Sequence, residues 1–258
     1  MIVDVDRYLE RIGLARPISF DAEGLETLQR AHLSTVPFEN LHVAARLGVR
    51  TDVAWSYRKI VEQRRGGWCF ELNGAFGALL RALDFDVRYV GAAVQLGGPN
   101  EVVDHLTLEV MLDEPWLVDV GFGESFCRPL ALNRRGGQDG GIGQFEFVSS
   151  PRGSTLAQLI DGVAEAQYRF KRVALELTDF DAASERLQTD EDGHWVHKPF
   201  ATRLLDGGPD RVTLLKDRLK FVRRGVTEEI LVAAEEWNET LVTWFSLGPA
   251  QSLGQHLG

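Results

Sequence analysis

The stretch RRGGWCFELNGAFGALLRAL, residues 64–83, constrains the fold more than any other part of the chain. Its leucine and phenylalanine residues recur at helical spacing from position 72 onward, which predicts a helix with one buried face. Cys69 then lies at or beside the helix N-terminus, where unpaired N–H groups and the helix dipole favour negative charge. A thiol placed there ionises more readily, and the thiolate is its reactive form. A small, unreactive core cysteine beside a helix start is the alternative.

Composition narrows the classes of protein to which this chain can belong. It has 258 residues, 44% of them hydrophobic, and a net charge of −10 without a Lys/Arg-rich block, so nucleic acid is not an expected partner. It lacks an apolar run long enough to cross a bilayer and an N-terminal signal pattern, so we expect neither membrane association nor secretion. Its two cysteines, Cys69 and Cys127, exclude a disulfide framework and suit a reducing cytoplasm. They are too few for a cysteine-based zinc site, and we expect no metal.

The order of elements along the sequence indicates an α+β fold. Helical spacing dominates residues 1–85, with Asp21 as an expected N-cap. Short segments rich in β-branched residues follow at 86–96, 103–112 and 115–122, spaced as in an antiparallel meander. Residues 191–258 mix candidate strands with a final helix that we expect to end at Gly248 and Pro249. We therefore divide the chain into a helical segment (1–85), a β segment (86–190) and a mixed segment (191–258).

A nucleophilic cysteine needs a base, and that base needs a carboxylate to orient it. His105 lies in VDHLTLEV, on the polar face of an otherwise apolar strand, and the next strand carries Asp119 between two valines. A carboxylate inside an apolar strand is costly unless it is paired, which makes His105 its natural partner. A structural histidine and a solvated aspartate remain the alternatives. Taken together with Cys69, the pattern predicts a Cys–His–Asp site.

This site places a condition on the hairpin that joins the two strands. A two-residue turn at 113–114 would put His105 and Asp119 on opposite faces of the sheet, because side chains alternate along a strand. We therefore predict an odd-length loop or a β-bulge between them. A loop at 111–113 sets them directly opposite, and one at 112–114 sets them diagonally. We further expect Nδ1 of His105 to meet the Asp119 carboxylate.

Four blocks of the sequence resemble the arylamine N-acetyltransferase family, bacterial type. They are VPFENL (36–41), RRGGWCFELN (64–73), DHLTLEV (104–110) and WLVDVGFG (116–123), in the order in which that family carries them. The resemblance implies an N-terminal helical bundle, a central antiparallel β-barrel and a C-terminal α/β lid around a papain-like cysteine triad. It also implies that Cys69 is the nucleophile, His105 its base and Asp119 the residue that orients the histidine.

The same resemblance implies further site residues. Phe38, Val94, Phe122 and Phe200 match the lining of the family's acceptor pocket, with Phe200 in a segment that matches only loosely. The resemblance further implies a buried ion pair between Glu39 and Arg65 that supports the triad. Asp104 is a departure, because many relatives carry a small or neutral residue before the histidine.

The activity implied is ping-pong transfer of an acetyl group from acetyl-CoA, through a cysteine thioester, to an arylamine or arylhydrazine, or to the oxygen of an N-hydroxyarylamine. The partners are then coenzyme A and a small aromatic amine or hydrazine, and a homo-oligomer is left open. Because CoA is anionic and this chain is acidic, local cations must compensate; the candidates are Arg128, Arg134, Arg135, Lys198 and Arg203. The alternatives are an amide synthase of macrolactam biosynthesis and a papain-like or transglutaminase-like hydrolase. An intact triad argues against a non-enzymatic binding module.

Overall fold

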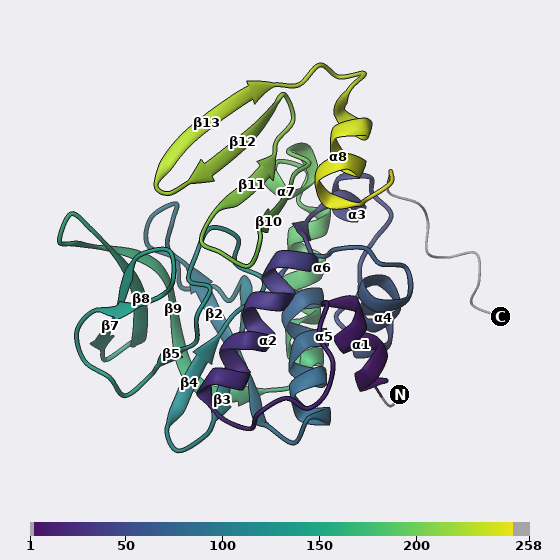
Figure 1. The fold of residues 1–258 in the computed structure, drawn as a ribbon. Helices are drawn as coiled ribbons and strands as arrows, with labels where there is room; N and C mark the ends of the chain where they lie inside the picture. The colour runs from purple at the N-terminus through teal and green to yellow at the C-terminus, as the bar shows by residue number, and fades with distance from the viewer. Residues whose placement is uncertain (1–2, 250–258) are drawn as a thin grey trace.

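The computed structural model describes residues 3–249 and begins with a group of helices. These comprise α1 (Val5–Arg11), α2 (Ala22–Thr35), α3 (Leu41–Ala44), α4 (Val53–Tyr57), the π-helical turn η1 (Arg58–Glu62) and α5 (Cys69–Ala82). In the view of Figure 1, α5 lies between α2 and α1. The Asp21 side chain accepts a hydrogen bond from the N–H of Gly24, which confirms the predicted cap of α2.

An antiparallel sheet of eight strands follows, in the spatial order β5-β4-β3-β2-β9-β8-β7-β6. Its strands are β2 (Asp86–Val94), β3 (His105–Met111), β4 (Pro115–Val118), β5 (Leu130–Ala131), β6 (Gln138–Asp139), β7 (Gln144–Ser150), β8 (Gly153–Ile160) and β9 (Val163–Leu175). The buried Gln138 side chain on β6 exchanges two hydrogen bonds with the backbone of Ala131 on β5, of 2.9 and 3.0 Å. Since β5 and β6 are the two edge strands, this contact nearly closes the sheet into the expected barrel.

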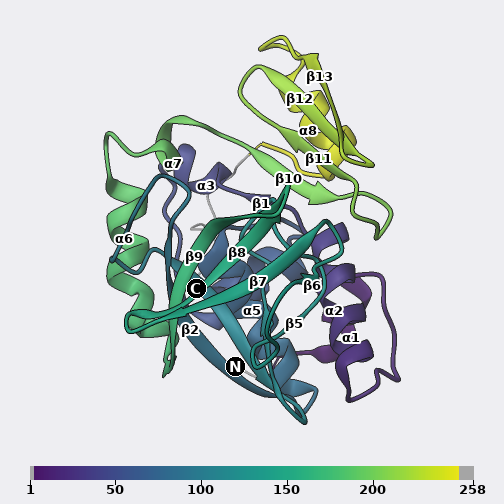
Figure 2. The same cartoon turned by 90° about the vertical axis from the view of Figure 1, so that its left-hand side faces the viewer.

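The rest of the chain forms a second, smaller sheet, seen above the barrel in Figure 2. It follows η2 (Leu177–Phe180), α6 (Asp181–Thr189) and α7 (His194–His197). The sheet has the order β1-β10-β11-β12-β13, from β1 (Phe38–Glu39), β10 (Ala201–Leu204), β11 (Arg211–Leu214), β12 (Arg218–Arg223) and β13 (Val226–Leu231). Helix α8 (Trp237–Phe245) packs on it. This order of helices, barrel and mixed α/β segment confirms the predicted fold class.

Some elements differ from the sequence expectation. The strand expected over 115–122 ends at Val118, because the following residues turn in against α5 rather than extending the sheet. Strands β1, β5, β6, β8, β10 and β13 were not predicted from the sequence. Strand β1 pairs with the distant β10, whereas β8 and β13 each pair with the strand directly before them. Helix α8 ends at Phe245, before Gly248, and its C-cap residue Ser246 adopts the left-handed conformation at φ 55°.

Strand β1 connects the first segment of the chain to the last one. It pairs with β10, so residues of the first segment complete the sheet of the last one. The Glu39 N–H also donates to the Gly67 carbonyl, at 2.8 Å, and this bond fixes β1 beside the start of α5. We retain 1–85, 86–190 and 191–258 as a proposed division into domains. Within the described residues, no helix is long and apolar enough to cross a membrane.

Candidate active site

Cys69 is the first residue of α5, as the sequence predicted, and its side chain is buried. The N–H groups of the first helical turn lack partners within the helix, so they present a positive end of the dipole to the sulfur. Two glycines allow neighbouring segments to approach it. A Cβ on Gly66 would lie 2.2 Å from the Pro37 carbonyl oxygen, and one on Gly121 would lie 2.7 Å from Cα of Cys69. The 119–121 segment therefore packs directly against the nucleophile's backbone.

The hairpin of β3 and β4 meets the condition that a triad imposes. Leu108 lies opposite Val118 and Met111 lies opposite Pro115, which leaves the three residues 112–114 as the connecting loop. This is the diagonal one of the two loops proposed from the sequence. The odd-length loop puts His105 and Asp119 on the same face of the sheet, so the predicted parity is confirmed.

Nε2 of His105 lies 2.7 Å from Oδ2 of Asp119, and both side chains are buried. The expectation that Nδ1 would meet the carboxylate is therefore wrong. The conformation of the His105 side chain turns the far nitrogen of the ring toward Asp119. Cys69 is close enough to the same imidazole to raise its pKa, so the three side chains form one connected group.

The Asp119 carboxylate accepts hydrogen bonds on both oxygens. Oδ1 receives the side-chain amide of Asn73 and the N–H of Gly121, each at 2.9 Å. Oδ2 receives the Tyr168 hydroxyl at 3.1 Å in addition to His105. Asn73 lies one turn after Cys69 on α5, and its side-chain oxygen accepts from the N–H of Val120 at 3.0 Å. The helix that carries the thiol therefore also fixes the carboxylate.

These contacts determine the charges of the pair. Burial lowers the pKa of His105, but the Asp119 carboxylate and the Cys69 thiol raise it, and the result is a pKa of about 10. Burial raises the pKa of Asp119, but His105, Asn73 and Gly121 lower it, and the result lies below its ordinary value. Burial, together with Asp119, raises the pKa of Tyr168, which therefore remains a hydrogen-bond donor. The site thus holds an imidazolium beside a carboxylate at neutral pH.

A second buried network supports the start of α5. Nζ of Lys59 lies 2.8 Å from Oε2 of Glu71 and 3.6 Å from Oε1 of Glu39, and all three side chains are buried. The same Glu71 oxygen accepts the N–H of Trp68, at 3.2 Å, which caps the helix one residue before Cys69. Glu39 therefore has Lys59 as its ion-pair partner, and the expected Glu39–Arg65 pair is corrected. Arg65 instead donates to the carbonyl oxygens of Gly248 and Pro249.

A cavity of about 350 Å³ opens onto the triad. Three of the four residues expected to line it do so, namely Phe38, Val94 and Phe122. Phe200 does not line it; its ring packs against Phe38, with centroids 5.2 Å apart, because β1 and β10 are paired. The sequence reasoning missed other lining residues: Leu96, Gly97, Asp104, Gly121, Leu187, His194 and Trp195.

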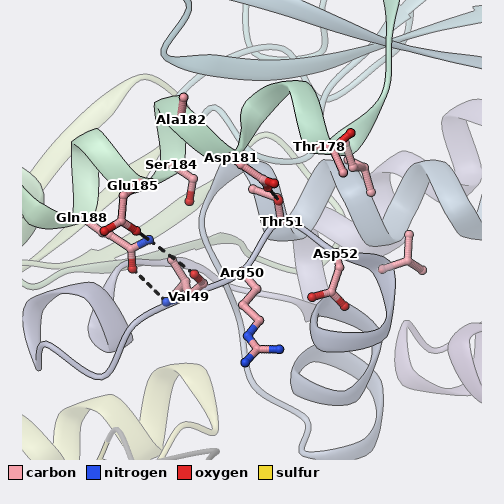
Figure 3. Close-up of a pocket in the computed structure, with 12 residues that line it drawn as sticks. Val49, Arg50, Thr51, Asp52, Thr178, Asp181, Ala182, Ser184, Glu185 and Gln188 are labelled. Atoms are coloured by element: carbon pink, nitrogen blue, oxygen red, sulfur yellow. Dashed lines mark hydrogen bonds between the residues drawn. The ribbon is translucent and has the colours of Figure 1, made fainter.

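A larger cavity of about 720 Å³ lies elsewhere, between the 49–53 segment and α6. Figure 3 shows Gln188 reaching across to the backbone of Val49, and Asp181 directed at Thr51. None of its lining residues belongs to the Cys69–His105–Asp119 group. Volume alone therefore does not identify the reactive site, and we place it at the smaller cavity because nucleophile, base and carboxylate meet there.

The five candidate cations differ in their surroundings. Arg128 pairs with Glu26 and Asp139. Arg203 donates to the carbonyl oxygens of Ser34 and Trp244. Arg134 and Arg135 are exposed near β5, away from the residues that line the cavity. Lys198 is exposed, and its charge acts on His194, which lines the cavity.

The raised pKa of His105 predicts a pH profile for the thiol's reactivity. The protonated ring stabilises a thiolate beside it, so iodoacetamide should alkylate Cys69 readily at pH 6. An ordinary free thiol is only about 0.3% ionised at that pH. The imidazolium that supports this reactivity loses its proton only near pH 10. The rate of alkylation, followed by mass spectrometry from pH 5.5 to 10, measures this.

His105→Gln should lose the reactivity at low pH and follow the steep profile of an ordinary thiol. An unchanged profile in this variant would show that the histidine does not activate Cys69. The same pKa shift has a consequence for stability. A raised folded-state pKa stabilises the fold fully below about pH 6.5, and this contribution is lost as the pH rises through about 10.

Comparison with known proteins places this site in a family. Residues 21–252 match the N-acetyltransferase family. The chain is similar to the arylamine N-acetyltransferase, pineal gland isozyme NAT-3, of Gallus gallus, with 30% identity over 95% of this chain and 94% of that protein. It is also similar to proansamycin X synthase of Amycolatopsis mediterranei, with 33% identity over 51% of this chain and 54% of that protein.

A solved structure agrees over nearly the whole length. The arylamine N-acetyltransferase of Mycobacterium marinum in complex with CoA superposes with a TM-score of 0.87 and 28% identity, over 94% of this chain and 92% of that one. The match in sequence extends across all three segments of the fold, including the helix that carries Cys69 and the hairpin that carries His105 and Asp119. This chain is therefore a member of the arylamine N-acetyltransferase family and an acyltransferase.

Proposed function

We propose that Cys69 carries the acetyl group between the two substrates of this acetyl-CoA-dependent enzyme, and that the acceptor is an arylamine or arylhydrazine. The observation that carries the proposal is the connected group of Cys69, His105 and Asp119 at the floor of a cavity with aromatic walls. The name of the M. marinum relative and its bound CoA support the choice of substrates.

In the first half-reaction the Cys69 thiolate attacks the thioester carbon of acetyl-CoA. The bond from that carbon to the CoA sulfur breaks, and the departing thiolate takes the proton of the His105 imidazolium. Asp119 stays ionised throughout, because its two oxygens accept four hydrogen bonds, and it holds the ring in place.

In the second half-reaction the nitrogen of the arylamine attacks the acetyl-thioester. Neutral His105 accepts the proton of that nitrogen, the bond to the Cys69 sulfur breaks, and the thiolate–imidazolium pair is restored. An aromatic amine is uncharged at neutral pH and fits between flat side chains such as Phe38, Phe122 and Trp195. By the same route an N-hydroxyarylamine would accept acetyl on its oxygen.

Mass spectrometry of the protein after incubation with acetyl-CoA tests the proposal. The expected result is one acetyl group per chain, located on Cys69 by peptide mapping and lost when 4-methoxyaniline is added. The absence of any adduct, with free CoA still released, would indicate hydrolysis or direct transfer and would overturn the thioester step.

Amide synthesis on a tethered acyl chain is the second candidate function, and the similarity to proansamycin X synthase favours it. The two functions share the chemistry at Cys69 and differ in the acyl donor. An adduct that forms with a long acyl thioester and not with acetyl-CoA would favour the synthase. A member of either type would not cleave a peptide without an acyl donor, which separates both from a papain-like hydrolase.

A further inference from the structure

The cavity that opens onto Cys69 has a carboxylate in its wall. Asp104 immediately precedes β3 and lines the cavity together with Cys69 and Phe122, and its carboxylate is close enough to His105 for their charges to interact. The rest of the lining that the structure describes is apolar apart from the cysteine and two histidines. The charge of Asp104 is not needed for the chemical steps above, because Asp119 already orients the base.

The Asp104 carboxylate is held in one position. Its Oδ1 accepts the N–H of Val94 at 2.8 Å, and its Oδ2 accepts the side-chain amide of Asn100 at 2.7 Å. The N–H of Asp104 itself donates to the Ala92 carbonyl at 3.0 Å, so the backbone is fixed as well. Both oxygens act as acceptors, as in an ionised carboxylate, and each retains a lone pair that a ligand can use.

The other ionisable groups of the lining do not cancel this charge. In the acetyl-enzyme that the acceptor meets, acylated Cys69 and the neutral His105 of the second half-reaction carry no net charge. Burial, together with nearby Lys198, lowers the pKa of His194 below its ordinary value, so His194 is uncharged at neutral pH. Arg186 and Lys198 are close enough to act on Asp104 and His194, but neither lines the cavity. The cavity therefore carries a net negative charge at the place where an acceptor must enter.

We propose that Asp104 determines which acceptors this enzyme uses, favouring arylamines that carry a cationic or hydrogen-bond-donating ring substituent and rejecting arylamine carboxylates. The proposal rests on the proposed function, because the acceptor must enter this cavity to reach the acetyl-thioester. A fixed carboxylate attracts a cation and repels an anion more strongly in a partly buried cavity than in water.

Three acceptors of nearly equal shape test the proposal: 4-aminobenzoate, 4-aminobenzamide and 4-aminobenzamidine, whose substituents are anionic, neutral and cationic. In a ping-pong reaction, kcat/KM for the acceptor reports only the second half-reaction, so binding of CoA does not enter the comparison. For each enzyme, kcat/KM for the benzoate and kcat/KM for the amidine are each divided by kcat/KM for the neutral amide. These two ratios are then compared between each variant and the wild type. These ratios cancel differences in active fraction and in the reactivity of Cys69.

Asp104→Asn should raise the relative kcat/KM for 4-aminobenzoate about tenfold or more and lower that for 4-aminobenzamidine about tenfold or more, since two charges a few ångströms apart near a protein surface interact at least that strongly. Asp104→Glu, which keeps the charge, should retain the wild-type order of acceptors. The matched control is Asp86→Asn, which removes an equal charge from the exposed, opposite end of β2 and should leave both ratios unchanged. Ratios in Asp104→Asn that equal those of the wild type would overturn the proposal.

A second measurement keeps the test independent of acetyl transfer. The same three compounds should protect Cys69 of the wild type against iodoacetamide in the order amidine, amide, benzoate, and Asp104→Asn should remove the difference between amidine and benzoate. If no compound is acetylated, the proposed function fails, and the order of protection alone decides the role of Asp104. Equal protection by all three in the wild type would overturn the charge selection.

Discussion

Replacing Cys69 by serine should lower the rate of acetyl transfer by about 10⁴-fold or more, because the thiolate forms the bond to the acetyl group and a serine hydroxyl does not ionise in its place. The acetyl adduct seen by mass spectrometry should disappear as well. The fold should persist, since serine is slightly smaller and is tolerated at the first turn of a helix. Steady-state kinetics and thermal unfolding of the same preparation measure both effects.

Cys127→Ala is the matched control for this loss. Cys127 is also buried and free, but burial raises the pKa of its thiol, and it lies outside the cavity that contains the triad. The variant should keep most of the activity and form the full acetyl adduct. If Cys69→Ser kept substantial turnover, or if the adduct moved to Cys127, Cys69 would not be the nucleophile.

Asp119→Asn should lower kcat/KM by about 10²–10⁴-fold, as expected for a residue that orients a catalytic histidine. The structure gives a specific reason. Both oxygens of Asp119 accept hydrogen bonds, so the NH₂ group of an asparagine would face donors in either orientation, His105 and Tyr168 on one side or Asn73 and Gly121 on the other. The buried imidazolium would also lose its counter-charge, at a cost of about 3–5 kcal/mol in the free energy of unfolding.

Tyr168→Phe serves as the control for Asp119→Asn, because it removes one hydrogen bond from the same carboxylate and leaves the charge in place. Its rate should fall by less than about tenfold, in keeping with the loss of a single hydrogen bond. The pKa of Asp119 lies below its ordinary value when folded, so its contribution to stability is present above about pH 4 and is lost as the pH falls through the folded-state value. The difference in stability between wild type and Asp119→Asn should therefore shrink in acid. A near-normal rate in Asp119→Asn would show that the carboxylate is only structural.

The sequence by itself determined the features that depend on local pattern. Helical spacing after Gly67 placed Cys69 at a helix start, and the strand pattern placed His105 and Asp119 on the two arms of one hairpin. Even the parity of the connecting loop followed from counting, because side chains alternate strictly along a strand. Short motifs in a fixed order also predicted the family and the order of its three segments.

Only the tertiary structure decided which atoms and which long-range partners meet. The loop at residues 112–114 set His105 and Asp119 diagonally, and the conformation of the His105 side chain determined that Nε2, not Nδ1, contacts Asp119. Pairing of β1 with β10 put Phe200 behind Phe38 instead of in the cavity wall.

The same limit applies to the ion pairs and to the residues that the sequence reasoning missed. The choice of Lys59 over Arg65 as partner of Glu39 depends on how η1 packs against α5. Tyr168 reaches Asp119 from a strand 49 residues away. A sequence pattern shows the spacing at which a residue type recurs within one helix or strand. These contacts instead join segments that are far apart in the sequence, and the spacing between such segments is not periodic.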